Sequence, residues 1–227
     1  IVFATISAPS YMTGLYKSTD GGNSWNRVDT ASYTVNAVFL SPSFVTDQTL
    51  LAFSSSVIIK SIDGGSSWGA VSTGLPNGLI KSVAVSPNYT LDNTLYVGMN
   101  GQHGDWSTAQ GIGIFKSSDG GVIWTSVNTG LTNLEVNSIA LSPNYTADQT
   151  LFAGTYDREG LFKSTNGGSS WSVANTGLAG LLINSVALSP NYPLDHTIFG
   201  FYLPFSGTYY GSLSSPSSLF KSVDGGT

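Results

Sequence analysis

The stretch Lys60-Ser-Ile-Asp-Gly-Gly-Ser-Ser-Trp68 decides the fold, because versions of it return along the whole 227-residue chain. The other copies are Lys17-Ser-Thr-Asp-Gly-Gly-Asn-Ser-Trp25, Lys116-Ser-Ser-Asp-Gly-Gly-Val-Ile-Trp124, Lys163-Ser-Thr-Asn-Gly-Gly-Ser-Ser-Trp171 and Lys221-Ser-Val-Asp-Gly-Gly-Thr227. Their lysines are 43 to 58 residues apart. Self-similarity at such a period is the sequence signature of a repeat protein, in which each unit is one supersecondary motif.

A second element precedes each later copy, and it combines a Ser-Pro pair with an Asp-x-Thr step. It occurs as Ser41-Pro42 with Asp47, Ser86-Pro-Asn-Tyr-Thr90 with Asp92, Ser142-Pro-Asn-Tyr-Thr146 with Asp148, and Ser189-Pro-Asn-Tyr-Pro193 with Asp195. One unit divides into four short apolar segments bounded by Gly, Pro, Asn and Asp, which predicts strands at 136–141, 150–154, 161–164 and 170–174. No segment shows sustained helical periodicity.

Four antiparallel strands in a unit of this length are typical of a β-propeller blade. We therefore predict an all-β fold, either a β-propeller or an open propeller-like array. Whole blades are expected at 35–79, 80–135 and 136–182, with partial blades at 1–34 and 183–227. The partial blades hold three strands each and do not merge into one four-stranded blade, so we expect further blades of the same polypeptide or other copies of it beyond both ends.

The Asp-Gly-Gly run is predicted to turn the third strand of each blade into the fourth. Gly supplies positive φ without steric cost, and Asp accepts hydrogen bonds from the backbone N–H groups of the turn. The Trp is expected to re-enter the strand and cover the turn.

This pattern resembles the Asp-box, or bacterial neuraminidase repeat, whose consensus is Ser/Thr-x-Asp-x-Gly-x-Thr/Ser-Trp. The resemblance covers the whole chain, in four to five copies. It implies a propeller like those of sialidases, xyloglucan-cleaving glycoside hydrolases, sortilin-type receptors and a photosystem assembly factor, whose functions differ widely.

The recurring carboxylates are interpreted as structural, because one copy carries an amide in their place. Asn166 keeps the acceptor oxygen but not the acid, an exchange that suits a turn and not a general acid. The structural positions are Asp20, Trp25, Asp63, Trp68, Asp119, Trp124, Asn166, Trp171 and Asp224. The Asp-x-Thr loops each offer one carboxylate, where calcium usually takes several oxygens, so we predict neither a metal nor a cofactor.

Composition narrows the function classes further. Charged residues make up 9% of the chain and the net charge is −5, which speaks against nucleic acid as a partner. No apolar run is long enough to cross a membrane. The low charge and two sequons, Asn88-Tyr-Thr90 and Asn144-Tyr-Thr146, favour a secreted or cell-surface protein.

Known enzyme sites fit the sequence poorly. A sialidase-like site needs three arginines, and this chain has two, Arg27 and Arg158. A glycosidase pair is available only as Asp105 with Asp157 or Glu159, which are better interpreted as solvated loop charges. His103 and His196 are too few for a metal site.

Two insertions between second and third strands are the candidate binding surface, since insertions on one face of a repeat protein commonly bind ligands. They are 99–111 and 202–218, and they supply the candidate ligand-binding residues His103, Asp105, Trp106, Tyr202, Phe205, Tyr209 and Tyr210. Tyr156 of blade four is a further candidate. An equally weighted interpretation is that these aromatic residues cover a neighbouring blade or subunit.

We conclude that the sequence favours a non-catalytic extracellular propeller that serves as a scaffold or a carbohydrate- or protein-binding module. Two alternatives stay open: a self-assembling subunit of an extracellular fibre, and a fragment of a polysaccharide-active glycoside hydrolase.

Overall fold

The computed structural model describes residues 1–6, 14–30, 33–101, 111–156, 160–178, 181–203 and 218–226. Its strands form five antiparallel sheets, and in each sheet the strands pair in chain order. The second, third and fourth sheets have four strands each, namely β4 (Ala37–Leu40), β5 (Leu50–Phe53), β6 (Ile58–Ser61) and β7 (Gly69–Ala70); β8 (Leu79–Val85), β9 (Leu95–Asn100), β10 (Gly111–Ser117) and β11 (Thr125–Ser126); and β12 (Val136–Leu141), β13 (Leu151–Thr155), β14 (Leu161–Ser164) and β15 (Ser172–Val173). The first and fifth have three strands, β1 (Val2–Ile6), β2 (Gly14–Ser18) and β3 (Asn26–Val28), and β16 (Leu182–Leu188), β17 (Ile198–Leu203) and β18 (Ser218–Ser222).

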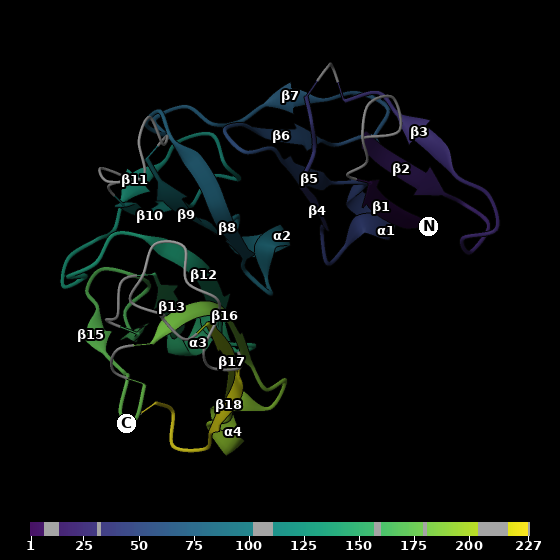
Figure 1. The fold of residues 1–227 in the computed structure, drawn as a ribbon. Helices are drawn as coiled ribbons and strands as arrows, with labels where there is room; N and C mark the ends of the chain where they lie inside the picture. Colours follow the sequence, from purple (N-terminus) through teal and green to yellow (C-terminus); the bar gives the residue numbers. More distant parts are fainter. Residues whose placement is uncertain are drawn as a thin grey trace.

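These sheets are the blades of an open array, and we number them one to five in chain order. Figure 1 shows them following one another along an arc, with β4, β8, β12 and β16 on its inner side and β7, β11 and β15 on its outer side. The inner strand β12 lies against both β8 and β16, so neighbouring blades pack face to face. The predicted all-β, propeller-like array of four-stranded blades, with the Asp-Gly-Gly hairpins between third and fourth strands, is confirmed.

Two local features differ from the sequence prediction. The fourth strands β7, β11 and β15 are only two residues long and begin after the Trp, so the Trp does not belong to the strand. The Ser-Pro loops, for which no helix was predicted, each contain one helical turn: α1 (Phe44–Asp47), α2 (Tyr89–Asp92), α3 (Tyr145–Asp148) and α4 (Tyr192–Asp195). A single turn is too short to leave a helical period in the sequence.

The hydrophobic core lies in the seams between blades and not in one central cluster. One cluster joins Tyr96 and Ile114 of blade three to Val136, Phe162 and Trp171 of blade four. Further clusters span the other seams, and their members are buried almost completely. Each blade therefore depends on its neighbour to remove its apolar face from water.

An aromatic pair repeats at several seams, and it joins a strand residue to the helical turn of the next blade. The rings of Phe3 and Phe44 meet edge to face with their centroids 5.9 Å apart, and those of Phe152 and Tyr192 at 5.7 Å. Between blades three and four the pair is Tyr96 and Tyr145, whose hydroxyls lie 2.5 Å apart. The Tyr96 hydroxyl also lies 2.7 Å from the Gly167 carbonyl of blade four.

The repeated lysine connects the blades at these seams, a role that its place in the sequence does not reveal. The Nζ of Lys17 donates to the Gly64 carbonyl of the next blade at 2.8 Å, and that of Lys163 donates to the Gly225 carbonyl at 3.3 Å. Each Nζ also lies over an aromatic ring, 5.7 Å from the centroid of Phe3 and 5.5 Å from that of Phe152. We call Lys17, Lys60, Lys116, Lys163 and Lys221 the seam lysines.

We predict that Lys116→Met destabilises the protein by about 1 kcal/mol, the usual worth of one hydrogen bond or one cation–π contact. Lys116 lies 5.5 Å from the Tyr96 ring centroid, donates to the Gly167 carbonyl at 3.4 Å, and has a pKa lowered by burial. Urea denaturation measures the change. Lys81→Met is the matched control, because Lys81 is exposed and is not a seam lysine; equal losses for both variants would contradict the assignment.

Candidate functional site

The carboxylate of each Asp-Gly-Gly turn accepts hydrogen bonds from the turn itself. In blade two, Asp63 Oδ1 accepts the backbone N–H groups of Ser66 and Ser67, both at 2.9 Å, and the Ser61 hydroxyl at 2.7 Å. Its Oδ2 accepts the Ser67 hydroxyl at 2.6 Å. These donors surround the carboxylate, so the side chain organises the turn.

The serine and the two glycines of the motif complete the turn. The Ser61 hydroxyl accepts the Gly65 N–H at 2.9 Å, and the equivalent bond forms at Ser117 with Gly121 and at Ser164 with Gly168. Gly64 and Gly65 have φ values of +70° and +91°, a conformation that side chains disfavour. The Trp68 indole N–H donates back to the Gly65 carbonyl at 3.2 Å.

Asn166 forms the same arrangement in blade four without a charge. Its Oδ1 accepts the Ser164 hydroxyl and the Ser170 N–H, both at 2.9 Å, and its Nδ2 donates to the Ser170 hydroxyl at 2.8 Å. The turn therefore needs an acceptor oxygen at this position and does not need an acid.

The electrostatics of the turn carboxylates oppose acid catalysis. Hydrogen bonds from Ser24 hold the pKa of Asp20 well below its usual range, and hydrogen bonds from Ser67 do the same for Asp63. The pKa of Asp119 is lowered by the backbone N–H of Ile123. A general acid at neutral pH needs the opposite shift, so these groups are ionised acceptors at neutral pH.

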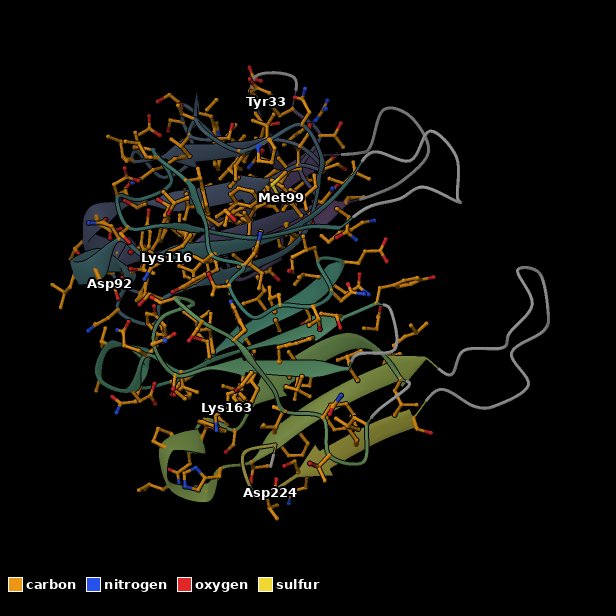
Figure 2. All side chains as sticks on the ribbon, turned by 90° about the vertical axis from the view of Figure 1, so that its left-hand side faces the viewer. Tyr33, Asp92, Met99, Lys116, Lys163 and Asp224 are labelled. Atoms are coloured by element: carbon orange, nitrogen blue, oxygen red, sulfur yellow. The ribbon has the colours of Figure 1, made fainter. Side chains whose placement is uncertain are left out.

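The Asp-x-Thr residues close the helical turns in the same way. Asp92 Oδ2 accepts the Ser86 hydroxyl at 2.5 Å and its Oδ1 accepts the Thr94 N–H at 2.9 Å. The residue between them, Asn93, is left-handed with φ 49°, and its carbonyl accepts the Gly120 N–H of the Asp-Gly-Gly turn at 3.0 Å. That hydrogen bond brings both turn types together on one face, which we call the turn face; Asp92 and Lys116 are labelled near it in Figure 2.

His196 occupies the position equivalent to Asn93 in blade five. Its φ is 49°, its ring lies 5.9 Å from that of Tyr192, and its carbonyl accepts the Gly225 N–H at 3.0 Å. The neighbouring carboxyl of Asp195 has a lowered pKa, chiefly because the Ser189 hydroxyl donates to it. His196 is thus placed in a turn.

The opposite end of the blades carries the connections between second and third strands, and we call it the loop face. Of the predicted ligand-binding residues, His103, Asp105, Trp106, Phe205, Tyr209 and Tyr210 lie outside the described residues, as do Asp157 and Glu159. Tyr202 lies in β17. Tyr156 directly follows β13, is 50% exposed, and donates its backbone N–H to the Glu135 carbonyl at 2.9 Å.

The inner strands carry a polar feature near the loop face that is not evident from the sequence. The pairing of β8, β12 and β16 is interrupted by one extra residue in each strand, at Lys81, Asn137 and Asn184. Lys81 and Asn184 are exposed there. The extra residue of a β-bulge leaves the regular alternation of the strand, and bulges are frequent next to binding sites.

Two buried polar atoms lie in blade three, one of them at the bulge in β8. In the part of the chain that the structure describes, Asn100 Oδ1 and Ser82 Oγ are the buried side-chain atoms without a hydrogen-bond partner. Asn100 is 6% exposed and is the last residue of β9. Its amide oxygen is an acceptor that the described residues leave unused.

A shallow pocket of about 360 Å³ lies at the seam between blades one and two. Lys17, Arg27, Asp29 and Gly64 are among the residues that line it. Lys17 already donates to the Gly64 carbonyl, and Arg27 and Asp29 each have an interaction partner. The pocket contains one carboxylate, whereas glycoside hydrolysis uses two.

Other classes of site find no support among the described residues. They contain no group of three or more His, Cys, Asp or Glu side chains placed to hold a metal ion. None of their helices is long and apolar enough to span a membrane.

Comparisons with known proteins agree with the propeller-like fold. No protein-family model and no curated protein matches the chain. Among solved structures, it is similar to an ancestral GH74 enzyme (25% identity, TM-score 0.62, covering 83% of this chain and 24% of that one) and to the GH74 xyloglucanase from Xanthomonas campestris (14%, 0.61, 92% and 33%). It is also similar to the extracellular domain of a putative one component system from B. thetaiotaomicron (14%, 0.54, 82% and 24%). The chain thus spans a quarter to a third of the length of these proteins.

The lowered pKa values of the turn carboxylates predict an acid-sensitive fold. A carboxyl group stabilises the fold when its pKa is lower in the folded state than its unfolded value of about 3.9. This stabilisation is fully present above about pH 3.9 and is lost as the pH falls through the pKa of the folded state. We therefore expect the urea midpoint to fall steadily below about pH 4. Asp63→Asn, which copies Asn166, should make this fall shallower, and an unchanged pH profile in that variant would contradict the shift at Asp63.

Proposed function

We propose that the chain is a non-catalytic, extracellular Asp-box propeller module that acts as a scaffold and binds its ligand on the loop face. The observation that carries this proposal is that the repeated carboxylates hold the turns of the fold. On the turn face they accept several hydrogen bonds each and have lowered pKa values where a shift is resolved, so they serve the fold. Of the other carboxylates that are described, Asp29 and Glu135 both have interaction partners.

The loop face supports binding because it presents polar groups that do not serve the turns as the repeated carboxylates do. Lys81 and Asn184 are exposed at bulges, Tyr156 is half exposed, and Asn100 Oδ1 has no hydrogen-bond partner among the residues that the structure describes. Amides and an exposed phenol ring suit hydrogen bonding and stacking with a carbohydrate or a peptide.

A hydrolase fragment is the second candidate, and the similarity to GH74 enzymes favours it. The chain spans less than a third of the ancestral GH74 enzyme, so catalytic residues of such a protein would lie partly elsewhere. The two candidates differ in one observable, the release of reducing sugar.

We predict that the chain binds a soluble glucan such as xyloglucan without cleaving it. Tyr156→Ala should weaken binding roughly fivefold, the equivalent of about 1 kcal/mol for a stacked ring. Leu91→Ala is the matched control, because Leu91 is 78% exposed and lies in α2 on the turn face. Calorimetry measures binding and a reducing-sugar assay measures cleavage. Sugar release would favour the hydrolase fragment. Equal glucan affinities of the Tyr156→Ala and Leu91→Ala variants would contradict binding on the loop face.

Extracellular location leads to a second prediction, which concerns N-glycosylation. Asn88 and Asn144 are exposed, and the side chain of neither forms a capping hydrogen bond in its helical turn. Expression through a eukaryotic secretory pathway should add glycans at both residues, detectable as intact mass that glycosidase treatment removes. Asn191 is an internal control, because Pro193 replaces the Thr of its sequon. Modification of neither Asn88 nor Asn144 would contradict the prediction.

A further inference from the structure

One polar position repeats where the inner strands begin, at the loop-face end of the blades. It occurs as Val35-Asn36-Ala37 in blade two, Ile80-Lys81-Ser82 in blade three, Val136-Asn137-Ser138 in blade four and Ile183-Asn184-Ser185 in blade five. We call Asn36, Lys81, Asn137 and Asn184 the inner row. Asparagine is depleted in strands, and this position lies outside both turn motifs, so neither strand formation nor the turns account for it.

The bulge in β8 turns its row residue away from both seams. Ile80 packs in the seam with blade two. The Ser82 hydroxyl and Val136 of blade four lie together over Gly98, so Ser82 faces the opposite seam. Lys81, the extra residue between them, is exposed and belongs to neither seam. Because β8 pairs only with β9, Lys81 is left at the free edge of the sheet, on the inner side of the arc (Figure 1).

The bulge in β12 has the same effect on Asn137. Val136 packs in the seam with blade three, and Ser138 Oγ accepts the backbone N–H of Val186 of blade five at 3.0 Å. Asn137 lies between them and is partly exposed at the free edge of β12. Blades three and four each have a neighbour on both sides, so this placement is a property of the interior of the array.

Further polar and aromatic groups lie at the same end of these blades. Tyr156, which is 50% exposed, directly follows β13 at the end where Asn137 lies in the paired strand. Asn100 ends β9 beside the start of β8, close in sequence register to Lys81. Asn100 is 6% exposed, and its Oδ1 has no hydrogen-bond partner among the residues that the structure describes. The row is therefore flanked by a ring and by a buried acceptor.

The chemistry of the row suits a neutral glycan. An amide offers donors and an acceptor to sugar hydroxyls, and a phenol ring offers a surface for stacking. Lys81 brings the one charge of the row, and Glu135, which directly precedes β12, brings the opposite charge. Such a surface favours a neutral ligand over an ionic one.

The free inner edges are poorly suited to an extended peptide. A peptide that adds a strand to a sheet needs a regular row of backbone N–H and C=O groups, and a bulge interrupts that row. The inner strands β8, β12 and β16 each contain such a bulge. Side chains, and not the backbone, are thus the groups that these edges present.

We propose that the inner row binds a linear, neutral polysaccharide that runs along the arc from blade to blade. A recognition group that recurs in successive blades fits a ligand whose own units recur, because each row residue meets a similar set of hydroxyls. The inference rests on the proposed function, since it names the ligand class and the contact residues of the loop-face end.

The test is a length series of cello-oligosaccharides, from cellobiose to cellohexaose, measured by calorimetry. Affinity should rise with length, because a longer chain reaches more row residues. Asn184→Ala and Lys81→Met should each weaken cellohexaose binding roughly threefold, the effect of one hydrogen bond, and leave cellobiose binding nearly unchanged. Asn144→Ala is the matched control, because Asn144 is exposed on the turn face and forms no capping hydrogen bond with its side chain.

Tyr156→Ala separates the row from the stacking ring. A stacked ring acts on one sugar unit, so this variant should weaken cellobiose and cellohexaose binding by similar factors, whereas the row variants act on cellohexaose. Urea denaturation checks that each variant is folded.

Three results would overturn the inference. The first is an affinity that does not change with length, or row variants that bind cellohexaose like the unaltered chain; xyloglucan binding that persists in them would still support the proposed function. The second is the lack of binding to xyloglucan and to every oligosaccharide, which would overturn the proposed function as well. The third is an oligoproline that binds more tightly than cellohexaose and is lost in Asn184→Ala, which would assign the row to a peptide.

Discussion

The contact between the faces of neighbouring blades is the interaction on which the rest of this structure depends. A small antiparallel sheet has two faces, and in this chain both are apolar in the interior blades: β5, β9 and β13 are buried along their whole length. A strand that is buried on both sides cannot fold alone, so each blade gains its stability from the blade before it and the blade after it. The seam lysines follow from this arrangement, because an ammonium over a ring can reach a carbonyl across the seam without an ion pair.

This dependence divides the molecule into a constant face and a variable one. On the turn face, serine, aspartate and glycine are fixed by hydrogen bonds within the turn, and the first glycine N–H ties the turn to the helical turn beside it. Asn166 shows how little freedom is left there, since its Oδ1 still accepts the Ser164 hydroxyl and the Ser170 N–H. The connections of the loop face carry no repeated sequence motif of this kind, and they differ in length and composition from blade to blade. The loop face is therefore the surface on which a specific ligand site is able to evolve.

Much of the fold was predictable because its determinants are local. Consecutive residues determine the Asp-Gly-Gly turn and the strand pattern, and their recurrence gives the repeat interval. The strand predicted at 161–164 accordingly coincides with β14. The helical turn at Tyr145 was not predictable in this way, because four residues carry no periodicity. The partners of Lys116 were also hidden: its contact with Gly167 joins residues 51 positions apart, which only packing brings together. For the candidate site the sequence indicated a face, and it gave no sign of the bulge at Lys81, which depends on the pairing register of β8 with β9.

The seams and turns also explain the unusual composition of the chain. Five of its eight basic residues are seam lysines, and eight of its thirteen acidic residues belong to the Asp-Gly-Gly turns or the Asp-x-Thr loops. Most of the charge is thus committed to hydrogen bonds within the fold. At these repeat positions eight carboxylates and five lysines leave a net charge of −3, out of −5 for the whole chain. A net charge of this size gives only weak long-range attraction of ligands. Recognition by such a protein therefore rests on short-range contacts, namely the shape, hydrogen bonds and aromatic rings that the loop face offers.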